Sequence, residues 1–305
     1  MTLPAADRLH ALLPRAARRA AQWRPLLLLL VAGWVPTALL AVPLWRVLAD
    51  NLDNSVHAAQ WAQRLDLVMA TDTIAQLTRA GSALAGAAIA SLLLTLLLIP
   101  FQDAVLVTAA RTNERLRLGE LLHAGLREYG PMLRLLLVSL LPLALALGLS
   151  ALAFKGVNRY AAHAVLADDV DRLGWLADAL AAVLVITALA GVEAGRARFA
   201  YDPRKRSAFK AWWRGVKLVF RHPLRSYGVV LGISVPALLA AAVLGLARLE
   251  LSTAGAGGFI AGWLIVQLLA TVLNWAHLAR LSGLYEVTRV QQEAATRHLR
   301  PTALA

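Results

Sequence analysis

The sequence predicts an all-α, polytopic membrane protein, and two observations lead to that fold class. First, 59% of the 305 residues are hydrophobic and only 16% are charged, with a mean hydropathy of +0.61. Soluble domains have roughly 45–50% apolar and about 25% charged residues, so a soluble globular enzyme is nearly excluded. Second, the apolar residues form six long runs, and runs of about 20 residues are typical of helices that cross a bilayer.

The six predicted spans are residues 25–45, 80–102, 135–154, 175–192, 226–247 and 251–279. The first follows several arginines, as in a signal peptide, but five more spans follow it, so we interpret it as a retained transmembrane helix. Residues 47–79 have a helical pattern that predicts an outer helical cap. In the last run, glycines at 255, 257 and 258 predict that the helix proper begins near Phe259.

Lysine and arginine are divided unevenly between the two sets of connecting segments. Segments 1–24, 111–134, 196–225 and 280–305 contain 24 positive and 7 negative residues, whereas the intervening segments contain 7 and 9. Because cytoplasmic loops are enriched in Lys and Arg, we predict that both termini are cytoplasmic, in a bacterial inner membrane. The net charge of +13 is then mainly a topology signal, and we expect no nucleic-acid partner.

Internal similarity predicts three tandem units within a single domain, residues 1–305. A short amphipathic segment, here called an elbow, precedes the first, third and fifth spans, and a proline that can start the next helix closes each one. These three spans also contain internal prolines, Pro36, Pro142 and Pro236, which serve either gating or packing. The predicted units are about 9–110, 115–200 and 206–290, each an elbow, a span, an outer loop and a second span. Residues 291–305 form a predicted cytoplasmic tail.

The elbow before the fifth span has two distinct helical faces. Its predicted apolar face contains Phe209, Trp212, Trp213, Val216, Val219 and Phe220. Its basic face contains Lys210, Arg214, Lys217 and Arg221. A basic face beside a tryptophan-bearing face is typical of a helix in the headgroup layer of an anionic leaflet. We expect Lys210, Trp212, Trp213, Arg214, Lys217 and Arg221 to face anionic lipid, either as an anchor only or to capture a lipid.

Ionisable residues inside spans are costly and are therefore candidates for function. Six polar residues near the cytoplasmic ends of the even spans are of this kind: Asp103, Glu193, Arg196, Asn274, His277 and Arg280. The spacing places Glu193 and Arg196 on one helix face, and likewise His277 and Arg280. The cluster either relays protons or binds an ion, or Glu193 and Arg196 form an ordinary structural pair and Asp103 pairs locally. Glycines at 191/195 and 258/262 fit close helix packing.

Several kinds of chemistry lack supporting residues. The chain contains no cysteine, which excludes disulfides and thiolate metal sites. It contains no Walker A, His-Glu-x-x-His or Gly-x-Ser-x-Gly motif, and its seven histidines lack metal-ligand spacing. We therefore expect no enzymatic activity, no metal and no cofactor.

One stretch of about 30 residues resembles a known group of proteins. The segments GRARFAYDPRKRSAFKA (195–211) and FRHPLR (220–225) resemble the cytoplasmic connection of uncharacterised bacterial six-span inner-membrane proteins. The chain is more faintly similar to the membrane domain of some glycerophosphodiester phosphodiesterases, but the sequence contains no soluble phosphodiesterase domain, so that activity is not implied. The resemblance implies a six-helix integral membrane unit of unassigned role.

Two functions remain open from the sequence alone. The first is transport or lipid handling through the six-helix bundle, which a recess reaching Asp103, Glu193 and His277 would favour. The alternative is a non-catalytic scaffold or accessory subunit, which a closed bundle with these groups mutually paired would favour. The expected partners are membrane lipids, anionic at the cytoplasmic leaflet, and a second copy of the chain or another membrane protein.

Overall fold

The structure, a computed structural model, describes residues 9–52, 67–112, 116–163, 167–201, 207–251 and 255–298. Within these ranges the chain forms α-helices and no strand. The helices are α1 (Leu9–Ala20), α2 (Trp23–Leu52), α4 (Leu67–Arg79), α5 (Gly81–Arg111), α6 (Leu118–Arg127), α7 (Tyr129–Ala161), α8 (Ala167–Tyr201), α9 (Ala208–Arg221), α10 (Pro223–Glu250) and α11 (Gly255–His298). The all-α prediction is confirmed for this part of the chain.

Six of these helices, α2, α5, α7, α8, α10 and α11, are long and apolar enough to cross a membrane. They match the six predicted spans and indicate a multi-pass integral membrane protein. Each helix is longer than its apolar run, because the helix continues past the point where its side chains become polar. α11 begins at Gly255, so the expected start near Phe259 is wrong. In apolar surroundings no water competes for the backbone groups, which lets the glycines stay helical.

A short amphipathic helix directly precedes each of α2, α7 and α10. These helices, α1, α6 and α9, correspond to the three predicted elbows. α6 begins with a capping box in which the Arg117 backbone N–H donates to the Glu120 carboxylate at 2.6 Å, and α10 begins with Pro223. The equivalence of three whole units stays a prediction. Of the predicted outer cap, residues 67–79 form α4, and residues 53–66 lie outside the described ranges.

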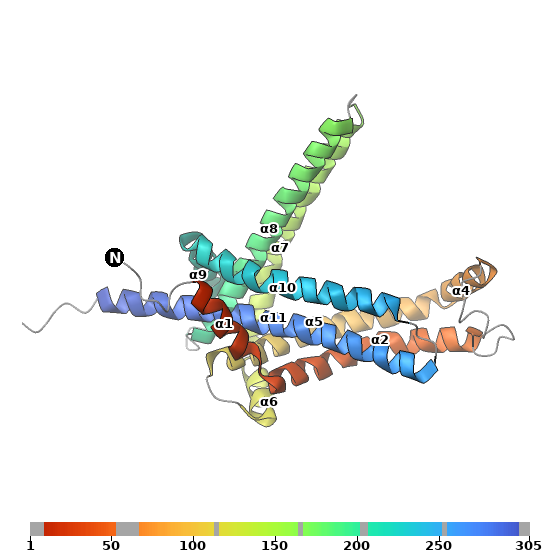
Figure 1. The fold of residues 1–305 in the computed structure, drawn as a ribbon, viewed down its shortest axis with the longest axis horizontal. Helices are drawn as coiled ribbons and strands as arrows, with labels where there is room; N and C mark the ends of the chain where they lie inside the picture. Colours follow the sequence, from red (N-terminus) through yellow and green to blue (C-terminus); the bar gives the residue numbers. More distant parts are fainter. Residues whose placement is uncertain are drawn as a thin grey trace, which may run out of the picture.

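The long helices form a four-helix group and a separate hairpin. α2, α5, α10 and α11 run alongside one another, whereas α7 and α8 diverge from them as a hairpin (Figure 1). α1, α6 and α9 gather toward one end of the group (Figure 1). The buried core concentrates at that end and includes Leu106, Leu121, Leu218 and Leu281. In the most apolar stretch of each span only 6–22% of residues are buried, so most of the apolar surface is free to face lipid.

Candidate functional site

Five of the six polar candidates meet where α5, α8 and α11 converge. Arg196 Nη2 lies 2.8 Å from Asp103 Oδ2, and Arg280 Nε donates to both oxygens of Glu193 at 2.8 and 3.0 Å. Glu193 and Arg196, which one of the two interpretations paired within a single helix, instead bind Arg280 of α11 and Asp103 of α5. Glu193 and Arg196 do share a face of α8, but this face packs against α11 and α5, and each of these helices supplies an oppositely charged side chain.

Two further side chains, His277 and Ser234, lie beside these ion pairs, and the two pairs with these neighbours are called the ion-pair cluster below. His277 Nε2 lies 3.9 Å from Asp103 Oδ1 and 3.5 Å from Arg196 Nη1. Arg280 Nη1 also donates to Ser234 Oγ of α10 at 3.2 Å. Within the described residues, no hydrogen bond or ion pair joins Asn274 to the cluster.

The cluster balances its charges internally. Asp103 and Glu193 are 3% and 6% exposed, and each has one arginine partner, so the desolvation of two anions is offset by two cations. No group of three or more His, Cys, Asp or Glu side chains able to hold a metal occurs in the part of the chain that the structure describes. The arrangement suits a structural tie between α5, α8, α10 and α11 better than an ion-binding site.

Another ion-pair group, which the sequence analysis did not single out, connects α1 to α11 around the buried carboxylate of Glu286. Arg19 binds Glu286, and Arg289 Nη2 lies 2.7 Å from the same carboxylate. Trp275 Nε1 adds a hydrogen bond to the Ala17 carbonyl at 3.1 Å. The signal available in the sequence was Glu286 itself, an acidic residue whose neighbours Leu284 and Val287 are apolar and buried.

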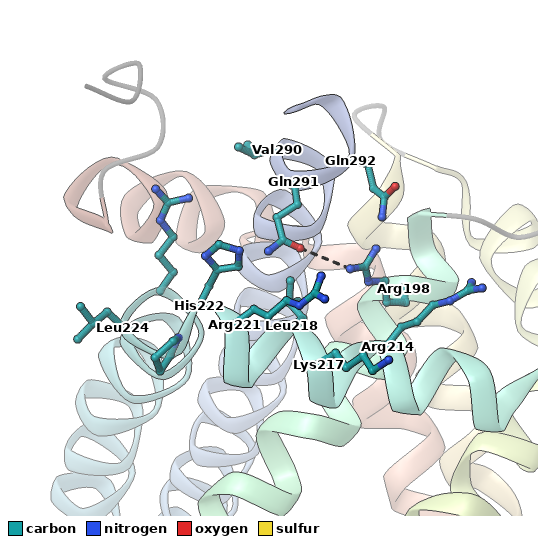
Figure 2. Close-up of a pocket in the computed structure, with 12 residues that line it drawn as sticks. Arg198, Arg214, Lys217, Leu218, Arg221, His222, Leu224, Val290, Gln291 and Gln292 are labelled. Carbon is teal, nitrogen blue, oxygen red and sulfur yellow. Dashed lines mark hydrogen bonds between the residues drawn. The ribbon is translucent and has the colours of Figure 1, made fainter. Parts of the chain in front are cut away.

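A basic pocket of about 780 Å³ lies where α8, α9, α10 and α11 meet (Figure 2). Its lining residues are Arg198, Arg214, Lys217, Leu218, Arg221, His222, Pro223, Leu224, Arg225, Val290, Gln291 and Gln292. Five of these described side chains are arginine or lysine, and none of those described is acidic. The pocket is therefore built to hold negative charge.

The positive charge of the basic pocket has little internal compensation. In the described ranges, no ion pair joins any of its five cationic side chains to a carboxylate. Arg198 Nη2 donates to Gln291 Oε1 at 3.4 Å, as Figure 2 shows, while its buried Nε has no partner among the described residues. The Lys217 ammonium lies 5.6 Å from the centre of the Trp213 ring. Partial burial and then the charges of Arg225 and Arg221 lower the pKa of His222.

The structure divides the predicted elbow residues between different environments. Arg214, Lys217 and Arg221 line the basic pocket, whereas Lys210 is exposed and outside its lining. Arg198, His222, Arg225 and Gln291 were missed. Arg198, His222 and Arg225 belong to the strongly basic connecting segment and gave a sequence signal, but nothing in the sequence connects Gln291 to α9.

The buried face of α9 differs from the predicted aromatic face. Its buried residues are Ala208, Ala211, Gly215, Leu218 and Val219, whereas Phe209, Trp213 and Phe220 are exposed. α9 packs so closely on α8 that a Cβ at Gly215 would lie 2.8 Å from the carbonyl carbon of Ala194. Close approach requires small residues, so the large aromatic residues are displaced to the side. Gly191 and Gly195 also face α9 closely, as their spacing predicted.

An apolar pocket of about 440 Å³ lies on the other side of α9. Its lining residues come from α7, α8, α9 and α10: Pro142, Leu145, Ala146, Leu149, Val183, Leu184, Thr187, Ala188, Gly191, Trp212, Val216, Val219, Phe220 and Tyr227. The Thr187 and Tyr227 hydroxyls form a hydrogen bond of 2.7 Å, which leaves the wall largely apolar. α9 therefore separates a basic pocket from an apolar one.

Comparisons with protein-family models, with curated proteins and with solved structures gave no match for this chain. The resemblance to uncharacterised six-span proteins stays a prediction.

Proposed function

We propose that this chain is a bacterial inner-membrane protein that handles anionic lipids and holds their phosphate headgroup in the basic pocket. The observation that carries the proposal is a pocket with five cationic side chains and no carboxylate among the described residues that line it. The uneven charge of the connecting segments supports a cytoplasmic position for this pocket and for both termini. Near an anionic leaflet each such residue contributes about 1 kcal/mol of attraction.

The position of α9 between its two pockets also supports lipid handling. Its basic side carries Arg214, Lys217 and Arg221, and its apolar side carries Trp212, Val216 and Phe220. A helix with these two sides suits the boundary between headgroups and acyl chains. A lipid beside α9 then meets cations at its phosphate and apolar side chains along its acyl chains.

Transport along a path through the ion-pair cluster has weaker support than lipid binding in the basic pocket. Asp103, Glu193 and His277 line neither the basic nor the apolar pocket. Both carboxylates are buried and paired with arginines. We therefore assign the cluster a structural role and the basic pocket the functional one.

The test uses spin-labelled lipids and the full chain reconstituted in phosphatidylcholine bilayers. Electron paramagnetic resonance gives the association of labelled phosphatidylglycerol relative to labelled phosphatidylcholine. The proposal predicts a preference for phosphatidylglycerol that falls roughly thirtyfold at the selective site in the Arg214→Ala/Arg221→Ala variant. The variant loses two residues that each contribute about 1 kcal/mol, and about 1.4 kcal/mol corresponds to a factor of ten. Lys210→Ala is the matched control, since Lys210 is exposed on the same helix outside the pocket. Equal association of both lipids with the wild-type chain would show the proposal to be wrong.

A scaffold or accessory subunit is the second candidate function, favoured by one observation. Only 6–22% of the most apolar span residues are buried, and the α7–α8 hairpin stands apart from the other spans (Figure 1), which leaves surface for a second copy or another membrane protein. Chemical cross-linking in native membranes distinguishes this role. A stable complex without any preference for anionic lipid supports the scaffold and contradicts lipid handling.

A further inference from the structure

We infer that the basic pocket recognises a headgroup with two phosphate groups joined by a short linker, rather than a single phosphodiester. This inference rests on the proposed function and names the ligand class of the same site. It follows from the number of cations in the pocket, from their arrangement along α9 and from the size of the pocket.

The positive charge of the basic pocket exceeds the negative charge of a single phosphodiester. A single phosphodiester carries one negative charge and would leave four of the five cationic side chains in the lining without a counter-charge. The pocket already disfavours further positive charge, since Arg225 and Arg221 contribute to the lowered pKa of His222. A second phosphate removes more of this repulsion, because an opposite charge nearby favours each cation.

The cations of the basic pocket are spread along α9 rather than gathered at one point. Arg214 and Lys217 of α9 lie with Arg198 of α8 toward one side of the pocket, and His222 lies toward the other, with Arg221 between them (Figure 2). Arg214 and Arg221 are seven residues apart, which is about 10 Å along a helix at 1.5 Å per residue. One phosphate therefore fits beside Arg198 and Arg214, and a second fits beside Arg221.

The volume of the basic pocket and its arginine donors also suit two phosphate groups. A pocket of about 780 Å³ lies within the roughly 300–1,000 Å³ of sites for small molecules and exceeds what one phosphate needs. Four of the five cations are arginines, whose planar guanidinium binds phosphate oxygens in pairs. The buried Nε of Arg198, which has no partner among the described residues, gives a further donor at this end of the pocket.

The test is native mass spectrometry of the full chain in mild detergent, titrated with three probes. Diphosphatidylglycerol carries two phosphates, phosphatidylglycerol carries one, and phosphatidylcholine is the zwitterionic reference. We expect diphosphatidylglycerol to bind at least tenfold more tightly than phosphatidylglycerol. Arg214→Ala and Arg221→Ala, each at an exposed side chain, should each reduce that ratio to about one, while Lys210→Ala leaves it unchanged.

The outcomes separate this inference from the proposed function. Equal binding of both anionic lipids, above phosphatidylcholine, overturns the two-phosphate inference and leaves the lipid site intact. No preference for either anionic lipid overturns both. Inorganic pyrophosphate is a fourth probe for the source of the phosphates. Competition by pyrophosphate at millimolar concentration supports a site for the headgroup, whereas pyrophosphate binding as tightly as diphosphatidylglycerol overturns a lipid as the ligand.

Discussion

Arg280 of α11 donates from Nε to both carboxylate oxygens of Glu193 on α8, at 2.8 and 3.0 Å. The two residues are 87 positions apart, and neither is the other's neighbour on a helix. Glu193 is 6% exposed, so its charge depends on this guanidinium rather than on water. The pair connects the C-terminal part of α8 to the middle of α11.

Removing Arg280 should therefore destabilise the protein strongly. Arg280→Met leaves Glu193 buried without its counter-charge, which costs about 3–5 kcal/mol. We expect a large fall in the free energy of unfolding, measured by denaturant titration in detergent, and substantial recovery in Arg280→Met/Glu193→Leu. Arg127→Met is the control, because Arg127 pairs with Glu128 with 57% of its side chain exposed and should cost at most about 1 kcal/mol. Additive effects in the double variant would contradict this pairing.

The contact between α8 and α9 gives a second prediction. A Cβ at Gly215 would lie 2.9 Å from the Gly191 carbonyl oxygen, and backbone atoms have little room to move aside. Gly215→Ala should lower the free energy of unfolding by about 1–3 kcal/mol. Gly148→Ala in α7, where nothing lies within 4 Å of the new Cβ, should be neutral or stabilising by up to about 1 kcal/mol. Equal effects of the two substitutions on the thermal melting point would refute the close packing.

His222 should report the positive charge of the basic pocket. Burial, Arg225 and Arg221 lower its pKa below the ordinary value of about 6.5, so the folded protein favours the neutral imidazole. The stability that this preference contributes is present above the unfolded pKa and is lost as pH falls through the folded pKa. Arg225→Ala should raise the pKa of His222 in a histidine-selective NMR titration, and a bound phosphate should do the same. An unchanged titration midpoint in both experiments would argue against the charged pocket.

The hydrogen bond from Trp275 to the Ala17 carbonyl predicts how α1 is held. Trp275→Phe keeps most of the ring but removes the donor, at a cost of about 1 kcal/mol. We expect faster hydrogen exchange confined to α1, measured by mass spectrometry in detergent. Trp45→Phe, at a side chain that is 65% exposed, is the control and should leave exchange in α1 unchanged. Faster exchange throughout the chain would show that Trp275 acts through general packing.

The spans could be predicted from the sequence because bilayer thickness imposes one length scale on every apolar run. The contacts between them could not, since periodicity gives the face of a helix and not the helix that it meets. Glu193 and Arg196 share a face as predicted, yet Glu193 binds Arg280 and Arg196 binds Asp103. These partners depend on the packing of α5, α8 and α11.

The candidate site was predictable only in part for a related reason. The basic face of α9 was visible in the spacing of Arg214, Lys217 and Arg221. Gln291, however, lies on α11, 70 positions after Arg221 in the sequence, and reaches the same pocket. The aromatic face of α9 was also visible in the sequence, but the face that packs against α8 was not, because it consists mainly of small residues. Where two helices approach closely, as at Gly195 and Gly215, small residues are buried and aromatic residues remain outside.

Photochemical cross-linking can show whether a lipid phosphate occupies the basic pocket, as we propose. The full chain is reconstituted with a phosphatidylglycerol analogue that carries a photoreactive group on its headgroup, and the labelled peptides are located by mass spectrometry. We predict labelling concentrated on α9, the beginning of α10 and the region of α11 around Gln291, and reduced in Arg214→Ala/Arg221→Ala. Labelling concentrated on other basic segments, such as those of Arg111 and Arg127, or equal in the variant, would show that the lipid phosphate does not occupy this pocket.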